Sequence, residues 1–115
     1  MSPSQLEFLR HILDECDFIL QAAEKKSQEE IISDGTLSRA LLRSLEIIGE
    51  AVKNLEDDLT CKYPQVDWDN IAGMRDRIIH GYFGIDYDVV YSTIVENIPD
   101  LHHEIKQIIE LESTK

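Results

Sequence analysis

Four residues near the middle of the chain bring together a fixed positive charge, a carboxylate, an imidazole and a phenol: Arg75, Asp76, His80 and Tyr82. An arginine stays cationic and offers a planar fork of donors to a phosphate. A histidine has an unperturbed pKa of about 6.5 and exchanges protons near neutral pH. Arg75 and His80 therefore suit charge stabilisation and proton transfer at an RNA phosphodiester, with the substrate's own 2′-hydroxyl as nucleophile. We predict that they are the catalytic pair and that no metal or cofactor is needed.

The spacing of the pair constrains its geometry. Residues five positions apart on one helix are offset by about 140°, so Arg75 and His80 converge only under a further condition. Either His80 lies where the helix ends, or a two-fold dimer brings the same segment of two chains to one cleft. In such a dimer one imidazole acts as base and the other as acid. We therefore expect a homodimer, the alternative being that Arg75 and His80 are a structural pair that ties a helix end to its neighbour.

Two further charged residues, Asp76 and Arg77, lie beside the pair. Asp76 follows Arg75 directly, and it either supports the active site by orienting Arg75 or His80 or is a solvated helix charge. Arg77 lies on nearly the opposite helix face from Arg75, which favours a surface or dimer salt bridge.

Other polar groups do not form a convincing metal site. Glu46 and Glu50 are one helical turn apart but lack a matching His or Asp, so we expect a solvated or interface face. His102 and His103 are adjacent, and neighbouring helix positions diverge by about 100°, so they make no chelating pair.

The elements that position these residues are predicted to be helices. Apolar residues recur three and four positions apart through most of the chain, and sustained β alternation is absent. Pro3 and Gln5 mark a helix start, Asp34 and Gly35 a turn, and Pro99 either a break or the first residue of a last helix. The expected helices run over about residues 3–26, 37–60, 68–80 after an Asp67 cap, 87–98 after an Asp86 cap, and 101–109, with one possible turn at 29–33. We predict a single all-α domain over residues 1–115, an up-and-down bundle of four to five helices.

Composition limits the function classes. The net charge of −12 over 115 residues opposes long-range attraction to nucleic acid, so an RNA site must be locally basic and salt-sensitive. The same charge fits a basic protein partner equally well. Because no apolar run approaches the ~18 residues of a membrane span and no signal-peptide layout is present, we expect a cytoplasmic protein without membrane contact. Cys16 and Cys61 lack metal or redox spacing and are expected to be reduced packing residues.

A family resemblance adds to this interpretation. The pattern Arg75-x4-His80-x-Tyr82 resembles the motif of HEPN-domain toxins of the HepT family. Residues 44–53, SLEIIGEAVK, resemble that family's second-helix signature, and residues 68–91 resemble its motif helix, glycine loop and following helix. The resemblance implies a homodimeric, metal-independent endoribonuclease with its cleft at the dimer interface. It also implies a partner, a small nucleotidyltransferase antitoxin called MntA, which inactivates the toxin by adding AMP to the motif tyrosine, here Tyr82.

Three functions remain open from sequence. The first is the metal-independent ribonuclease of a toxin–antitoxin pair. The second is a non-catalytic HEPN subunit that holds a nucleotide or substrate for a partner nucleotidyltransferase. The third is a purely structural helical dimer in which Arg75 and His80 support the interface. Tyr82 has its own alternative, which is packing against Phe83 at a turn.

Overall fold

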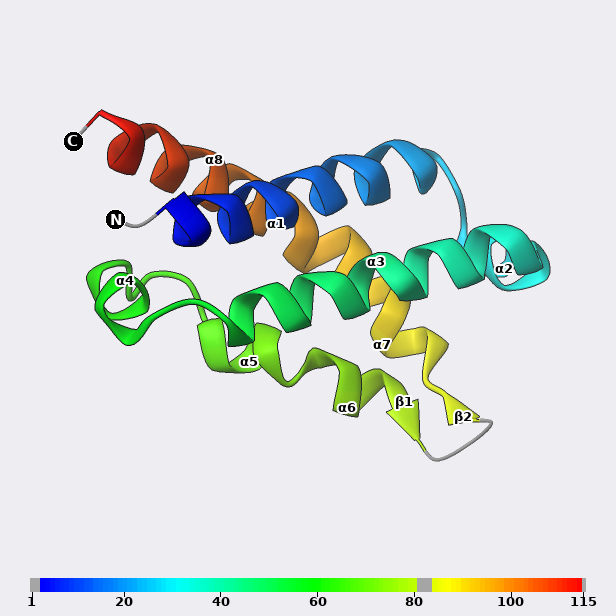
Figure 1. The fold of residues 1–115 in the computed structure, drawn as a ribbon. Helices are drawn as coiled ribbons and strands as arrows, with labels where there is room; N and C mark the ends of the chain where they lie inside the picture. Colours follow the sequence, from blue (N-terminus) through cyan, green and yellow to red (C-terminus); the bar gives the residue numbers. More distant parts are fainter. Residues whose placement is uncertain (1–2, 81–83, 115) are drawn as a thin grey trace.

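The structure is a computed structural model that describes residues 3–80 and 84–114. It consists almost entirely of helices, with one pair of two-residue strands (Figure 1). In chain order the elements are α1 (Pro3–Ala22), α2 (Gln28–Ser33), α3 (Gly35–Lys53), α4 (Asp57–Lys62), α5 (Trp68–Ala72), α6 (Met74–Ile78), β1 (Ile79–His80), β2 (Gly84–Ile85), α7 (Tyr87–Ser92), the π-helical turn η1 (Thr93–Asn97) and α8 (Ile98–Ser113).

Three long helices form the bundle. Helix α1 packs against α3 on one side and α8 on the other, and the short elements α5 and α6 lie along α3 away from α1 (Figure 1). The centre of the α1 stripe is fully buried at Leu9, Ile12, Cys16 and Ile19. This confirms the all-α bundle, because an apolar stripe wide enough to cover two neighbours is what a central helix needs. In the described part of the chain no helix is long and apolar enough to span a membrane.

The predicted helix over residues 37–60 is wrong in its second half, since α3 ends at Lys53 and α4 begins at Asp57. The buried side chain of Gln5 holds this break. Its amide nitrogen donates to the carbonyl of Asn54 at 3.2 Å, and its carbonyl oxygen accepts from the backbone N–H of Glu56 at 2.8 Å. Gln5 was expected to cap its own helix, but it instead satisfies backbone groups that the break exposes 49 and 51 residues away.

The predicted helix over residues 68–80 is also divided. Gly73 separates α5 from α6, and α6 ends at Ile78, two residues before His80. The chain leaves the helix because Ile79 and His80 pair antiparallel with Ile85 and Gly84. The backbone N–H of Asp86 also donates to the carbonyl of Ile78 at 2.8 Å. His80 is therefore on a strand of a small hairpin rather than on the helix that carries Arg75.

The helix caps follow the sequence closely. The side chains of Asp67 and Asp86 accept from the backbone N–H groups of Asn70 and Val89 at 3.2 and 3.1 Å, as expected for N-caps. Asp34 differs from its prediction as a turn, because it caps α3 by accepting from Leu37 at 3.0 Å. The 29–33 segment is the short helix α2.

Pro99 lies in the first turn of α8, which begins at Ile98. Proline has no N–H to donate to the carbonyl four residues earlier. The π-helical turn η1, with its wider hydrogen-bond spacing, directly precedes it and joins α7 to α8 without a loop.

The two cysteines differ in environment. Cys16 is fully buried, and its burial, with smaller contributions from Asp17 and Glu15, raises the pKa of its thiol to about 12. A thiol in that state stays protonated and behaves as a packing group. Cys61 is exposed on α4, so the expectation that it is a packing residue is wrong.

The Gln5 contact gives a first prediction. Gln5→Ala should lower the free energy of unfolding by about 1–3 kcal/mol, because the partly buried hydrogen bonds to the backbone groups of Asn54 and Glu56 are lost. Urea denaturation measures this value. Gln21→Ala, an exposed change on the same helix, is the control and should have little effect. An equal, small effect of both changes would show that Gln5 does not stabilise the α3–α4 break.

Candidate active site

Packing against α3 positions the helix that carries Arg75. At Gly49 on α3, an added Cβ would lie 3.4 Å from the carbonyl oxygen of Ile71 and 3.7 Å from that of Ala72. The glycine therefore permits the close approach of α5 to α3. Met74 and Ile78 anchor α6 in the core, each 2% exposed. With these apolar residues facing inward, Arg75, Asp76 and Arg77 are left at the surface.

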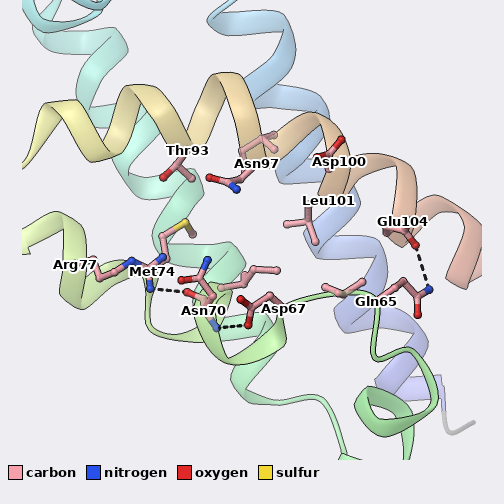
Figure 2. A pocket seen from close by; sticks show the side chains of 13 residues that line it. Gln65, Asp67, Asn70, Met74, Arg77, Thr93, Asn97, Asp100, Leu101 and Glu104 are labelled. Atoms are coloured by element: carbon pink, nitrogen blue, oxygen red, sulfur yellow. Dashed lines mark hydrogen bonds between the residues drawn. The ribbon is translucent and has the colours of Figure 1, made fainter.

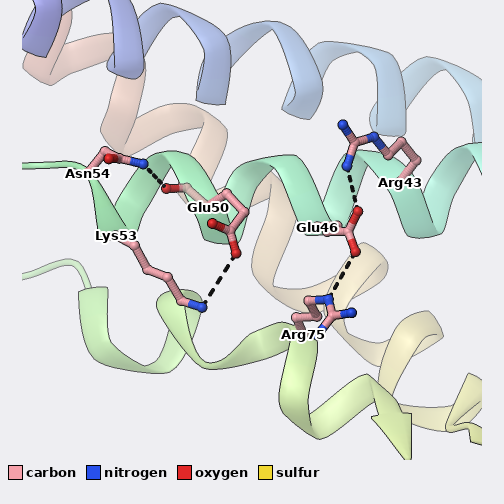
Figure 3. Close-up of polar contacts among 6 residues, drawn as sticks. All are labelled: Arg43, Glu46, Glu50, Lys53, Asn54 and Arg75. Carbon is pink, nitrogen blue, oxygen red and sulfur yellow. Dashed lines mark hydrogen bonds and ion pairs between the residues drawn. The ribbon is translucent and has the colours of Figure 1, made fainter. Parts of the chain in front are cut away.

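Arg75 is bound to a carboxylate of α3. Its Nε donates to Oε2 of Glu46 at 2.9 Å, and Nη1 of Arg43 donates to Oε1 of the same carboxylate at 2.5 Å (Figure 3). The side chains of Arg75 and Arg43 are 47% and 67% exposed, whereas that of Glu46 is 28% exposed. Two guanidinium groups from different elements thus share one partly buried carboxylate.

The pKa values reflect this arrangement. The hydrogen bonds from Arg75 and then Arg43 lower the pKa of Glu46 below its ordinary value. The hydrogen bond and charge of Glu46 raise the pKa of Arg75. Both shifts favour the charged forms, so the group carries two positive charges and one negative charge at neutral pH.

His80 lies at the end of β1, and its side chain is 60% exposed. Its Nε2 is 3.9 Å from Oδ2 of Asp86, whose other oxygen caps α7. The hairpin is tight at this point. A Cβ added at Gly84 would lie 2.4 Å from the His80 carbonyl oxygen, so the backbone can approach this closely only because residue 84 has no side chain.

Within the described chain, Arg75 and His80 have separate partners. No hydrogen bond joins them, and none joins Asp76 to either one in residues 3–80 and 84–114. Asp76 is exposed, and its charge contributes to the raised pKa of Arg75. Tyr82 lies outside the described residues.

Arg77 occupies a different surface from Arg75. Its Nη1 donates to the carbonyl of Asn70 at 2.8 Å, and its side chain lines a pocket of about 140 Å³ between α5–α6 and η1–α8 (Figure 2). The carboxylates of Asp67, Asp100 and Glu104 also line this pocket. Neither Arg75 nor His80 lines it. Its acidic rim does not suit a phosphate, so we separate it from the candidate active site.

The sequence did not reveal the role of Arg43 and Glu46. Their spacing of three positions does indicate a helical ion pair. The contact of Glu46 with Arg75, however, joins residues 29 positions apart and depends on how α6 lies on α3. Glu46 had been expected on a solvated or interface face.

Comparison with known proteins identifies the family of this chain. The model of the Ribonuclease HepT-like family matches residues 12–108. A protein of Caldanaerobacter subterraneus subsp. tengcongensis named "Putative RNase" is 47% identical over 105 residues, covering 91% of this chain and 94% of its own. One from Methanocaldococcus jannaschii with the same description is 41% identical over 103 residues, covering 90% and 85%.

A third relative is named for the family itself. The "Probable ribonuclease HepT" of Thermococcus cleftensis is 34% identical over 108 residues, covering 94% of this chain and 98% of its own. No solved structure matches the chain significantly. The chain belongs to the HepT-like ribonuclease family.

The Arg75–Glu46 contact gives a second prediction. The carboxyl of Glu46 should titrate below its ordinary pKa of 4.5, and Arg75→Ala should raise that pKa. Because folding lowers the pKa, the pair's contribution to stability is present above about pH 4.5 and is lost as the pH falls through the folded-state pKa. Carboxyl chemical shifts followed by NMR against pH measure it. Arg77→Ala is the control, and a Glu46 pKa unchanged in Arg75→Ala would contradict the assignment.

Proposed function

We propose that this protein is a metal-independent endoribonuclease, the toxin of a toxin–antitoxin pair, with Arg75 and His80 as its catalytic residues. The observation that supports this most directly is that Arg75 is exposed, with part of its guanidinium group unpartnered among the described residues, and that an exposed His80 follows five positions later. The chain that carries them belongs to the HepT-like ribonuclease family. The names of the relatives support RNA as the substrate.

The reaction follows from the two side chains. The general base removes the proton of a 2′-hydroxyl, whose oxygen forms a bond to the adjacent phosphorus. The bond from phosphorus to the 5′-oxygen breaks, and the general acid protonates that oxygen. The products are a 2′,3′-cyclic phosphate and a 5′-hydroxyl. Arg75 stabilises the additional negative charge on the phosphate in the transition state, and His80 transfers the protons.

A homodimer completes this proposal. The motif of one chain supplies one imidazole, that of His80, whereas the reaction needs a base and an acid. A two-fold axis that places both copies of the segment 75–80 at one cleft supplies both. It also doubles the local positive charge in a chain of net charge −12, which is what a polyanionic substrate needs.

We further propose that a nucleotidyltransferase antitoxin regulates the enzyme by adding AMP to Tyr82. The resemblance of the motif supports this proposal. The phenol oxygen attacks the α-phosphate of ATP, forms a phosphodiester and releases pyrophosphate. The added phosphate then competes with RNA for Arg75 and His80, and the nucleotide blocks the cleft.

The catalytic assignment gives a third prediction. His80→Ala should reduce RNA cleavage in EDTA by at least about 100-fold, the usual size of a general acid–base contribution, while the circular dichroism spectrum and melting temperature stay close to wild type. Product analysis of the wild type should find 2′,3′-cyclic phosphate ends. The control is His103→Ala, an exposed histidine of α8.

Three results would contradict parts of this function. Equal cleavage by His80→Ala and wild type would remove His80 from catalysis. A pure protein that binds nucleotide and partner but degrades no RNA would instead be the non-catalytic binding subunit. Light scattering that finds an active monomer would remove the dimer from the proposal.

The modification gives a fourth prediction. After incubation with ATP and the nucleotidyltransferase encoded beside it, the protein should carry AMP on Tyr82, and its RNA cleavage should fall in proportion. Peptide mass spectrometry locates the added group. Tyr82→Phe should stay unmodified at this position, because it lacks the attacking oxygen. AMP found on other residues and none on Tyr82 would contradict the assignment.

A further inference from the structure

Arg43, Glu46 and Arg75 form a group in which two arginines bind one carboxylate, whereas a simple surface ion pair has one arginine and one carboxylate. Each oxygen of the Glu46 carboxylate accepts a hydrogen bond from a different guanidinium group, one from Arg43 on α3 and one from Arg75 on α6 (Figure 3). An exposed ion pair contributes little to stability, because ordering two long side chains offsets most of the attraction. Stability alone therefore gives a weak reason for two arginines at one carboxylate.

The group leaves hydrogen-bond donors available to a ligand. Arg75 uses its Nε and Arg43 uses its Nη1 on Glu46. In residues 3–80 and 84–114, neither side chain has another hydrogen bond or ion pair. Because each guanidinium has five N–H donors, most donors of both remain free, on side chains that are about half or more exposed.

The charge of the group also favours an anion. The three side chains carry two positive charges and one negative charge in a protein whose total is −12, and the carboxylates of Asp76 and Glu50 add negative charge near Arg75. The carboxylate that holds the arginines is the least exposed of the three side chains. A phosphate therefore meets the guanidinium groups before it meets the carboxylate.

Space for a nucleotide adjoins Arg43. Its side chain lines a groove of about 260 Å³ between α1 and α3, together with Phe8, His11, Ile47 and the carboxylate-bearing Glu50. Phe8 and Ile47 give the groove a half-buried apolar surface. The groove and Arg75 are thus connected through Arg43 and Glu46.

We propose that Arg43 and Arg75 together bind backbone phosphates of single-stranded RNA, and that Glu46 is a positioning residue that fixes both guanidinium groups for this purpose. This inference rests on the proposed function and extends it, because it adds a substrate-binding residue and a positioning residue on α3 to the motif residues of the 75–82 segment. Glu46 acts through Arg75 and does not touch the substrate.

The fifth prediction tests Arg43 by binding. The probe is a fluorescent 2′-O-methyl RNA decamer, which keeps the phosphates but lacks the attacking hydroxyl. Arg43→Ala should weaken binding about tenfold, as the loss of a charged hydrogen bond implies. It should also reduce the slope of log affinity against log salt by about 0.7, the value for one phosphate contact on a single strand.

Arg39→Ala is the matched control for Arg43. Arg39 lies one turn earlier on α3, is exposed, and donates only to the carbonyl of Gly35, at 3.1 Å. Its removal changes the net charge equally and should alter affinity by less than about twofold. Equal effects of the two changes would overturn the assignment of Arg43, since overall charge would then account for both.

Glu46→Gln tests the positioning role. The amide keeps the shape but removes the charge that orients two arginines, so kcat should fall about tenfold or more. Affinity for the decamer should stay equal or become tighter, because removal of the negative charge offsets the loss of orientation in binding but not in catalysis. Glu110→Gln is the control, because Glu110 is an exposed residue of α8. It removes the same charge and should leave kcat unchanged. Circular dichroism checks folding of both.

Each result separates the alternatives. A higher kcat in Glu46→Gln would show that Glu46 restrains Arg75, and an unchanged kcat would show a merely structural contact; both overturn the positioning role. If Arg43→Ala dissociates a dimer without weakening binding per chain, Arg43 is an interface residue and the proposal fails. If the wild type cuts no RNA at all, the proposed function fails, and the decamer measurement still reports whether Arg43 binds phosphate.

Discussion

The candidate site depends on one charge-assisted hydrogen bond, from Nε of Arg75 to Glu46 across the contact between α6 and α3. Helix α6 has five residues, which is too short to be stable on its own. Burial of Met74 and Ile78 fixes the helix against the core, but an arginine side chain has several rotatable bonds and needs its own restraint. Glu46 provides this restraint from a long helix that is itself fixed by α1.

A second constraint separates the two residues of the motif. On an uninterrupted helix, Arg75 and His80 would diverge by about 140°. The chain avoids that geometry by ending α6 at Ile78 and pairing Ile79 and His80 with the β2 strand. The tight approach at Gly84 makes the pairing possible. Arg75 of the motif therefore lies on a helix and His80 on a strand. The orientation of His80 is set by the hairpin and by Asp86 rather than by helical periodicity.

The two polar surfaces of the chain differ in chemistry. The pocket around Arg77 has three carboxylates and one guanidinium group in its lining, whereas two guanidinium groups, those of Arg43 and Arg75, meet at the carboxylate of Glu46. In an acidic protein, affinity for a polyanion has to come from such a local excess of positive charge. This difference, more than the size of either cavity, is why we place RNA on the α3–α6 surface.

The sequence by itself determined the helical class, the apolar stripes, the caps at Asp67 and Asp86, and the segment that carries the motif. All of these depend on local patterns of three or four residues, which a single chain displays directly. Tertiary structure decided where the helices break and which charges meet. Gln5 divides residues 37–60 by binding backbone 49 and 51 positions away, and Glu46 meets Arg75 across 29 positions. The distance between such groups is fixed only after α1, α3 and α6 have packed. These contacts therefore cannot be predicted from the spacing of residues along the sequence.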